Sequence, residues 1–378
     1  MAKLVFTAQN FAFGPIGKLL YVIDLLKNKG DKLIFVGFGT SLQLAKKFPF
    51  DAIHEIDTDN PKSISDFEAI ISKSDALISS MDIPSVIVAK RLKKTVIWID
   101  CLFWFWPNIS EKIFNVDLYI RERFLNDSVN EAKYGTKIKN LYTVAPIMGN
   151  VKKLSRKNQA LISFGGAQAT YSYQAGKDTN YPFMMAGIML KNIDWSSFER
   201  VILATSESVV VELKKRFPNT PFDFMTLAHD KFLVEMSQSQ ILLTTPGLIT
   251  AQGAFYSETP TIFMPASNDS QYLQLEELRS LGLAPASVGL NEFLPKLHLL
   301  HIPGKESTKL MLLQLRELEQ LPEIQAKIGS RLNVLVQKRK EWSQDSVKKG
   351  KNFIDSLGGN GAQEAADKIT ELLALKGF

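Results

Sequence analysis

The sequence predicts an α/β protein made of two doubly wound, Rossmann-like domains that face each other across a cleft. Two observations support this fold class. Short runs rich in Val, Ile, Leu and Phe alternate with longer segments of helical periodicity, which is typical of a parallel sheet covered by helices on both faces. The alternation occurs once in each half of the 378-residue chain, and this length accommodates two domains of ordinary size.

The first half of the chain alternates strands and helices. An apolar run near the N-terminus predicts a strand, and the glycine-punctuated loop 10–17 links it to a segment of helical periodicity. The predicted strands are 3–7, 32–36, 76–79, 95–99 and 116–120. The predicted helices are 18–27, 41–47 and 83–91. Together they define an N-terminal domain of residues 1–145.

The second half repeats the pattern after a stretch that contains Pro146, Gly149 and four basic side chains. These residue types predict an exposed linker over 146–157 and a second domain over 158–350. The strands predicted there are 160–164, 200–204, 240–244 and 261–264, and the helices are 209–216 and 271–281. Helical spacing returns from about residue 309, and a Gly-rich break precedes a last helix at 362–375. We expect residues 351–378 to pack back across the domain junction.

Composition narrows the class of protein further. The chain has 45 Lys and Arg against 39 Asp and Glu, a mild excess that is spread along the sequence and favours anionic partners without forming a nucleic-acid-binding arm. Cys101 is the single cysteine, which excludes intrachain disulfides and cysteine-based zinc sites. The sequence contains neither a secretory signal pattern nor a long apolar run. We therefore expect a soluble or peripheral protein of the cytoplasm.

Glycine-rich loops follow three of the predicted strands, at 13–17, 163–168 and 245–250. In an open parallel sheet, ligands bind beyond the carboxyl ends of the strands, where helix N-termini present unpaired N–H groups. These loops are candidates for holding phosphate, although glycines there also simply permit tight turns. None matches the GxGxxG or GxxxxGK[ST] pattern, which argues against a dinucleotide or P-loop site.

Two segments carry a resemblance to a known family: LISFGGAQAT at 161–170 and ILLTTPGLITAQGAFYSETPTIFMPASNDSQYLQLEEL at 241–278. They resemble the donor half of two-domain GT-B glycosyltransferases, especially the branch of the lipid II N-acetylglucosaminyltransferase. The resemblance implies that the second domain binds a nucleotide sugar through its glycine loops and a polar run. The positions that match the family's donor contacts are Gly165, Gly166, Gln168, Gly247, Thr250, Asn268, Asp269, Gln271 and Gln274.

The donor half also departs from the family's pattern. A carboxylate that the family places on the helix after the diphosphate turn falls at Gly253, so Gln252 is the candidate for that contact. His229 lies where related proteins put the nucleobase, which makes it a candidate for base recognition. For the polar run, the alternative to sugar binding is helix capping, because Asn268 and Asp269 are good N-cap residues. The lone Asp-x-Asp motif, Asp57 to Asp59, lies in the other half, so we expect no metal or other cofactor.

A glycosyl transfer needs a general base beside the acceptor. Asp100 closes a predicted strand and is the first candidate, with capping of the following loop as the alternative role. Glu122 is the second candidate, with an ion pair to Arg121 or Arg123 as the alternative. Lys18 is expected to be exposed and protonated.

The acceptor itself is expected at the first glycine loop and at an aromatic run over 103–106. Four consecutive rings cannot all point into a core, so some are expected to stack on a ligand. The acceptor-binding candidates are Phe13, Gly14, Gly17, Lys18, Phe103, Trp104 and Trp106.

These observations predict a metal-independent glycosyltransferase that moves a sugar from a UDP or dTDP donor to a small molecule. The first loop and the aromatic run weakly resemble cytosylglucuronate synthases, which implies a nucleobase or another planar acceptor. One alternative is a peripheral membrane enzyme that glycosylates a lipid carrier. Another is a nucleotide-sugar hydrolase or binding protein of the same fold. No nucleic acid polymer is expected as a partner.

Overall fold

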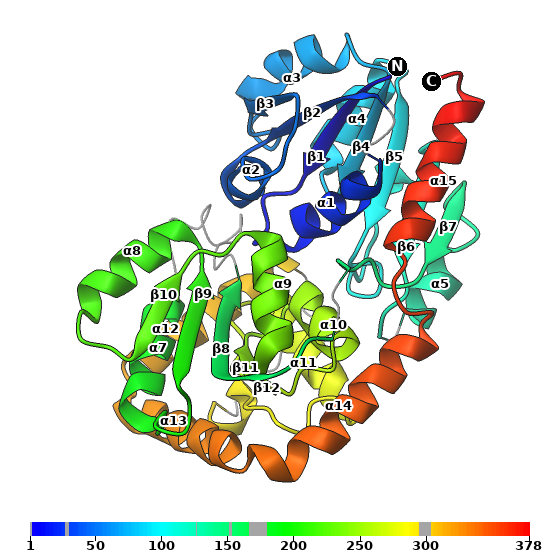
Figure 1. The fold of residues 1–378 in the computed structure, drawn as a ribbon. Helices are drawn as coiled ribbons and strands as arrows, with labels where there is room; N and C mark the ends of the chain where they lie inside the picture. The colour runs from blue at the N-terminus through cyan, green and yellow to red at the C-terminus, as the bar shows by residue number, and fades with distance from the viewer. Residues whose placement is uncertain (1, 27–29, 126, 151–152, 166–179, 295–303) are drawn as a thin grey trace. The chain divides into compact units, whose positions relative to one another are not determined.

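The computed structural model describes residues 2–26, 30–125, 127–150, 153–165, 180–294 and 304–378 (Figure 1). The chain divides into two compact units. Unit 1 contains residues 1–149 and 357–378, and unit 2 contains residues 150–356.

Unit 1 is built on a seven-stranded sheet in which every neighbouring pair is parallel. The strand order is β3-β2-β1-β4-β5-β6-β7, so the order reverses between β1 and β4. The strands are β1 (Lys3–Ala8), β2 (Lys32–Gly37), β3 (Ala52–Glu55), β4 (Ala76–Ser80), β5 (Thr95–Asp100), β6 (Leu118–Glu122) and β7 (Leu141–Val144). Strands β1, β4 and β5 are buried along almost their whole length, as expected for a parallel sheet with both faces covered.

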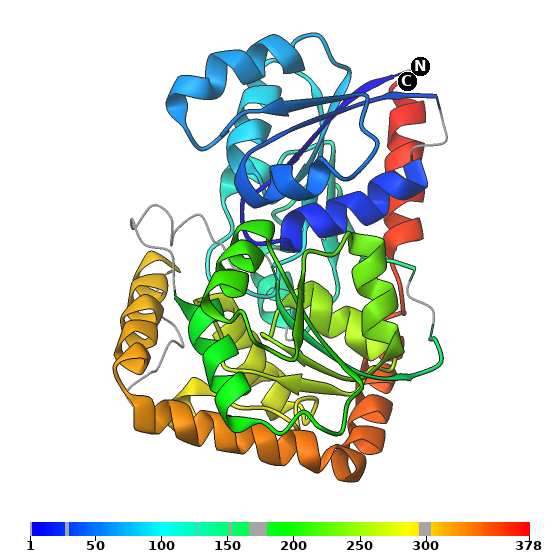
Figure 2. The ribbon, with the colours of Figure 1, turned by 60° about the vertical axis from the view of Figure 1, so that its left-hand side comes forward.

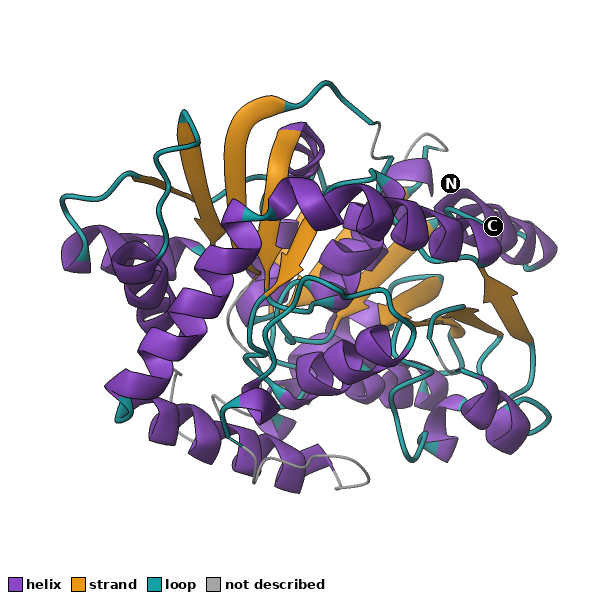
Figure 3. Ribbon diagram, turned by 90° about the horizontal axis from the view of Figure 1, so that it is seen from below, coloured by secondary structure: helices purple, strands orange, loops and turns teal. Residues whose placement is uncertain are grey.

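Helices cover both faces of this sheet (Figure 3). They are α1 (Gly14–Leu26), α2 (Gly39–Ala45), α3 (Ile64–Ile71), α4 (Ile83–Arg91), α5 (Ser128–Tyr134) and α15 (Ala362–Leu375), with short 3-10 turns η2 (Pro61–Ser63) and η3 (Glu111–Ile113). Helix α1 packs against α2 and α15, whereas α4 packs against α3. The last helix therefore belongs to the unit that contains the N-terminus, and two views show it alongside α1 (Figures 1 and 2).

Unit 2 has a five-stranded parallel sheet in the order β10-β9-β8-β11-β12. Its strands are β8 (Lys157–Gly165), β9 (Arg200–Thr205), β10 (Phe222–Met225), β11 (Ser239–Thr244) and β12 (Thr261–Phe263). Its helices are α7 (Tyr181–Asn192), α8 (Glu207–Arg216), α9 (His229–Gln238), α10 (Leu248–Tyr256), α11 (Asp269–Ser280), α12 (Gly304–Glu319), α13 (Pro322–Gln337) and α14 (Arg339–Ser356), with the 3-10 turn η4 (Leu290–Glu292). The strand order reverses between β8 and β11.

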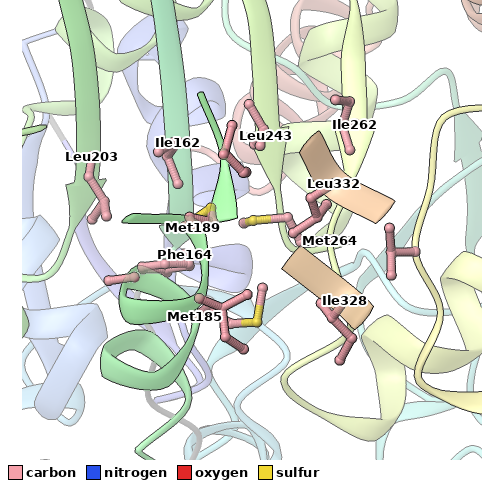
Figure 4. Close-up of a cluster of buried hydrophobic side chains, with 14 of the residues drawn as sticks. Ile162, Phe164, Met185, Met189, Leu203, Leu243, Ile262, Met264, Ile328 and Leu332 are labelled. Carbon is pink, nitrogen blue, oxygen red and sulfur yellow. The ribbon is translucent and has the colours of Figure 1, made fainter. Parts of the chain in front are cut away.

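One face of this sheet forms a core with α7 and α13 (Figure 4). Alternate strand residues such as Ile162, Leu203 and Leu243 point into it, where they meet Met185 of α7 and Leu332 of α13. The intervening residues of the same strands are also fully buried, because the opposite face is covered as well. Burial on both faces makes these strands continuous apolar runs, which is the pattern that predicted them from the sequence.

The predicted class of two doubly wound α/β domains is confirmed, but the stretch expected to be an exposed linker differs. Of the expected linker 146–157, residues 150, 153, 155 and 157 are exposed, but residues 146–149 are buried. The C-terminal segment covers them: the N–H of Gly361 donates to the carbonyl of Pro146 at 2.9 Å, and Met148 donates to the Asn360 side chain at 3.2 Å. The units divide after Gly149 and after Ser356.

The first helix also differs from the prediction, because α1 begins at Gly14 rather than at Lys18. Pro15 occupies its second position, where a missing N–H costs no helical hydrogen bond. Among helices in the described ranges, none has the length and apolarity needed to cross a bilayer.

Candidate functional site

The carboxyl ends of β8 and β11 form the switch point of the unit 2 sheet, where ligands bind in folds of this kind. Gly165 ends β8 with φ of +61°, and a Cβ built there would meet nothing within 4 Å. The Thr205 hydroxyl donates to its carbonyl at 3.2 Å and fixes this strand end. Gly166 and Gln168, which the sequence also predicted here, lie outside the described residues.

Helix α10 starts beside this strand end without a side-chain cap. Its N-cap residue is Gly247, in an extended conformation with φ of −84° and ψ of 141°. Glycine has no side chain that could cap the helix, so within the described residues no N-cap side chain satisfies the N–H groups of the first turn. Thr250 lies in that turn and is partly exposed. The first turn and the helix dipole together favour an anion.

Gln271 of α11 lies next to the start of α10. Its Nε2 donates to the Thr245 hydroxyl at 3.3 Å, and it lies 4.0 Å from the position that a Cβ on Gly247 would take. Its Oε1 accepts from both the N–H and the hydroxyl of Ser267, at 2.9 and 2.8 Å. The structure therefore brings three predicted residues, Gly247, Thr250 and Gln271, to one edge. Thr245 and Ser267 hold the glutamine there, which the sequence did not indicate.

Helix α11, by contrast, has a capped N-terminus. The side-chain oxygen of Asn268 accepts from the N–H of Gln271 at 3.0 Å and from the hydroxyl of Ser270 at 2.8 Å. The capping alternative for the polar run is thus confirmed for Asn268. Two neighbouring helices of unit 2 start differently, one with a cap of its own and one without.

The remaining polar candidates of the donor half lie in the interior of the protein. Asp269 accepts hydrogen bonds from Ser307 at 2.5 Å and Thr308 at 3.2 Å, so its carboxylate joins α11 to α12. Burial raises the pKa of Asp269. Gln252 is fully buried and Gln274 is 2% exposed. This enclosure by protein speaks against the predicted contact of Asp269 and Gln274 with sugar hydroxyls, and against Gln252 as the replacement for the family's carboxylate.

His229 is the first residue of α9, after β10, and is partly buried. Burial lowers the pKa of its imidazole to about 4, against which the nearby Asp230 carboxylate acts only weakly. The ring is therefore neutral at physiological pH, with one N–H donor and one ring-nitrogen acceptor. Base recognition by His229 stays a prediction.

In unit 1, Asp100 is the last residue of β5 and is 1% exposed. The Tyr119 hydroxyl donates to one carboxylate oxygen at 2.5 Å, and the N–H of Leu102 donates to the other at 2.9 Å. Burial raises the pKa of Asp100 to about 6, although the Tyr119 hydrogen bond lowers it. Its capping of the following loop is confirmed, and its enclosure speaks against the predicted role as a base that meets an acceptor.

Glu122 and Lys18 form a buried ion pair, with 2.7 Å between Lys18 Nζ and Glu122 Oε2. The ammonium group also donates to the carbonyl of Ile147 at 2.7 Å, and the N–H of Ile147 donates to Glu122 at 2.8 Å. The expectation of an exposed Lys18 is wrong, because α1 begins early enough to carry this residue on its buried face. Arg121 pairs instead with Asp127 and Glu131. The Lys18–Glu122 pair is therefore structural.

The aromatic run divides between interior and surface. Phe103 is fully buried, with its ring centroid 4.5 Å from the guanidinium carbon of Arg121, so its predicted acceptor contact is corrected. Trp104 and Trp106 are partly exposed. The side chain of Asn130 donates to the carbonyls of Phe103 and Trp106, at 2.5 and 2.8 Å, and fixes the loop. The expectation that the four rings cannot all point inward is confirmed.

The first glycine loop divides in the same way. Phe13 and Gly14 are partly exposed, and a Cβ on Gly14 would meet nothing within 4 Å. Gly17 is buried inside the first turn of α1. The residues of unit 1 that remain accessible for an acceptor are thus Phe13, Gly14, Trp104 and Trp106.

Known protein structures share this fold. No family model and no curated protein sequence matches the chain. The structure is similar to MurG of Acinetobacter baumannii, with a TM-score of 0.55, 12% identity and coverage of 98% of this chain and 100% of that one. It is similar to a UDP-glucose:anthocyanidin 3-O-glucosyltransferase in complex with UDP, with a TM-score of 0.56, 13% identity and coverage of 99% of both chains.

The spinosyn rhamnosyltransferase SpnG is a third similar structure, with a TM-score of 0.57, 9% identity and coverage of 99% of this chain and 100% of that one. The similarity extends over the whole chain in each case. The chain therefore has the two-domain GT-B fold, as the sequence predicted.

Proposed function

We propose that the protein is a glycosyltransferase that takes its sugar from a nucleoside-diphosphate donor bound by unit 2. The observation that carries the proposal is the uncapped start of α10 at the switch point of the sheet, with Thr250 and Gln271 beside it. In a chain with the GT-B fold, we infer that this helix start binds a diphosphate rather than serving only as a turn. The glycosyltransferases of similar fold, one of them in complex with UDP, support it.

The proposed chemistry follows from the charge that develops on the leaving group. When the bond between the sugar and the diphosphate breaks, negative charge accumulates on the β-phosphate. The first-turn amides of α10 and the Thr250 hydroxyl would stabilise that charge, so the proposal requires no metal. Gln271, held by Thr245 and Ser267, would present its amide to the diphosphate or to a sugar hydroxyl.

The acceptor is proposed to be a small planar molecule bound by unit 1. Trp104 and Trp106 are partly exposed at the carboxyl edge of β5, where they would stack on such a ring. Neither Asp100 nor Glu122 is assigned as the base, because both carboxylates are engaged inside unit 1. A lipid-linked acceptor is the alternative for the same aromatic loop.

Isothermal titration with UDP and with dTDP tests the donor site. We expect heat of binding with at least one of them. Thr250→Ala and Gln271→Ala should each weaken binding by about 1–2 kcal/mol, the usual effect of losing a hydrogen bond to a charged group. Ser280→Ala, at the opposite end of α11, is the control and should bind like the unmodified protein. Absence of heat with both nucleotides in a folded sample contradicts the proposal.

A further inference from the structure

A second hollow lies on the surface of unit 2, at the opposite edge of the sheet from the candidate donor site. Arg156 and Pro260 line it, directly before β8 and β12, so it lies where the strands begin. Its volume is about 550 Å³, enough for a small ligand. We call it the basic hollow; its lining residues are Lys153, Arg156, Glu258, Pro260, Ser343, Gln344, Val347, Lys348, Lys351 and Asn352.

The basic hollow carries more positive than negative charge. Four cationic side chains line it against one carboxylate. Glu258 is engaged by Lys153 at 2.5 Å, and Lys351 pairs with Asp355 at 2.6 Å. Among the described residues, two of the four cations form no ion pair with a carboxylate.

The first of these is Arg156. Its guanidinium donates to the carbonyls of Ser237 and Ser239 at 2.7 and 3.0 Å and to the Thr259 hydroxyl at 3.3 Å. These partners are neutral and fix the group in place, and the acidic group that acts on its charge is Glu258, which is itself paired with Lys153. Burial lowers the pKa of Arg156, as expected for a cation whose hydration is reduced, although the nearby Glu258 carboxylate raises it.

The second is Lys348, an exposed residue of α14. Within the described parts of the chain, its ammonium group makes no hydrogen bond or ion pair. Lys348 and Lys351 are three residues apart and share a helix face. Gly350 lets that helix approach α10 closely, because a Cβ there would come within 2.5 Å of the Phe255 ring. This contact brings α14 beside the start of the sheet.

We propose that the basic hollow is an anion-binding site that takes a phosphate group. Arg156 and Lys348, which are almost two hundred residues apart in the sequence, both line it. Guanidinium and ammonium groups bind phosphate through strong, charge-assisted hydrogen bonds. The phosphate belongs either to a free metabolite or to a lipid headgroup. This site is separate from the proposed donor site, since the two lie at opposite edges of the same sheet.

Titration of the full chain with inorganic pyrophosphate, after saturation with UDP, tests the free source. Lys348→Ala should weaken pyrophosphate binding on the order of tenfold, the effect of one lost charge-assisted hydrogen bond. Lys349→Ala is the matched control, since that lysine is adjacent on the same helix, does not line the hollow and pairs with Asp345. It should change binding by less than about twofold. Both positions are exposed, and thermal unfolding checks that both variants fold.

Flotation with vesicles tests the lipid source, with phosphatidylglycerol and phosphatidylcholine mixed in one set and phosphatidylcholine alone in the other. If the protein binds the anionic vesicles, and if Lys348→Ala abolishes this binding while Lys349→Ala retains it, the basic hollow binds a lipid headgroup. The proposal is overturned if neither probe binds, or if Lys348→Ala leaves both unchanged. UDP titration of the same variants keeps the two sites distinct: Lys348→Ala should leave UDP binding intact, and Thr250→Ala should leave the Lys348-dependent binding intact.

Discussion

The carboxyl edges of the two sheets have the same topology but use polar groups in opposite ways. In unit 1 the charged side chains at this edge are turned inward, where Lys18 pairs with Glu122 and Asp100 accepts from Tyr119. In unit 2 the corresponding edge also buries one carboxylate, Asp269, but beside it lie neutral groups: the start of α10, a hydroxyl and an amide side chain. Charged residues next to strand ends are thus engaged inside the protein, whereas the start of α10, which we propose as the diphosphate site, carries a glycine at its cap position.

The physical reason lies in the cost of burying charge. A charged side chain that is buried away from water is stable only when it is paired. Its partner then occupies the position that a ligand would need. Backbone amides at a helix start carry only partial charge and can remain available to a ligand without such a partner. Three experiments test this contrast between the two edges.

The largest expected effect comes from breaking the buried pair of unit 1. Glu122→Ala leaves the Lys18 ammonium buried without its partner, so we expect the free energy of unfolding to fall by about 3–5 kcal/mol. Urea unfolding measures it. The double variant Lys18→Met with Glu122→Leu removes both charges and should be more stable than Glu122→Ala. If Glu122→Ala unfolds like the unmodified protein, the pair is not enclosed as described.

A smaller effect is expected from Asp100→Asn, and it depends on pH. The pKa of Asp100 is raised from 3.8 to about 6 in the folded protein, so the stability that this group contributes is complete below pH 4 and is lost as the pH rises through 6. Asparagine does not ionise. The difference in unfolding free energy between the variant and the unmodified protein should therefore change by on the order of 2 kcal/mol in favour of the variant as the pH rises from 4 to 7.

Urea unfolding at both pH values measures this change. Asp82 has a pKa that is also raised to about 6 by burial, but it is present in both proteins and cancels in the difference. An equal stability difference between variant and unmodified protein at the two pH values would show that Asp100 does not titrate in this range.

The smallest effect distinguishes the two helix starts of unit 2. Asn268→Ala removes the cap of α11 and should lower the free energy of unfolding by about 1 kcal/mol. Thr250→Ala, in the first turn of uncapped α10, should leave the unfolding free energy unchanged within about 0.5 kcal/mol. Thermal unfolding of both variants measures the contrast, and a larger loss for Thr250→Ala would reverse it.

Local sequence patterns predicted much of the fold. Two helices were predicted with the bounds observed, 83–91 and 362–375, because each has clear start signals. Asp82 caps the first of them by accepting from Ser85, and Pro84 stands in its first turn. The glycine motif that begins α10 could also be recognised in the sequence, because the residues that form a tight turn are consecutive.

The groups that the sequence misplaced depend on contacts between distant positions. Lys18 and Glu122 are 104 residues apart, and Asp269 meets Ser307 across 38 residues. No local pattern shows whether such a side chain will face water or a partner. The structure places Gly247 and Thr250 at the start of α10, as the glycine motif indicated, and their contact with a donor stays a prediction. The carboxylate and amide candidates that resembled ligand contacts are enclosed by protein.

The return of the last helix to unit 1 has a consequence for how the chain matures. Helix α15 buries Ile369 and Leu373 within the unit that the first 149 residues begin. During synthesis, unit 2 can complete its core while the nascent unit 1 still lacks one of its covering helices. A product that ends before Ala362 would thus lack a covering helix of the unit built from the first 149 residues, far in sequence from the missing segment.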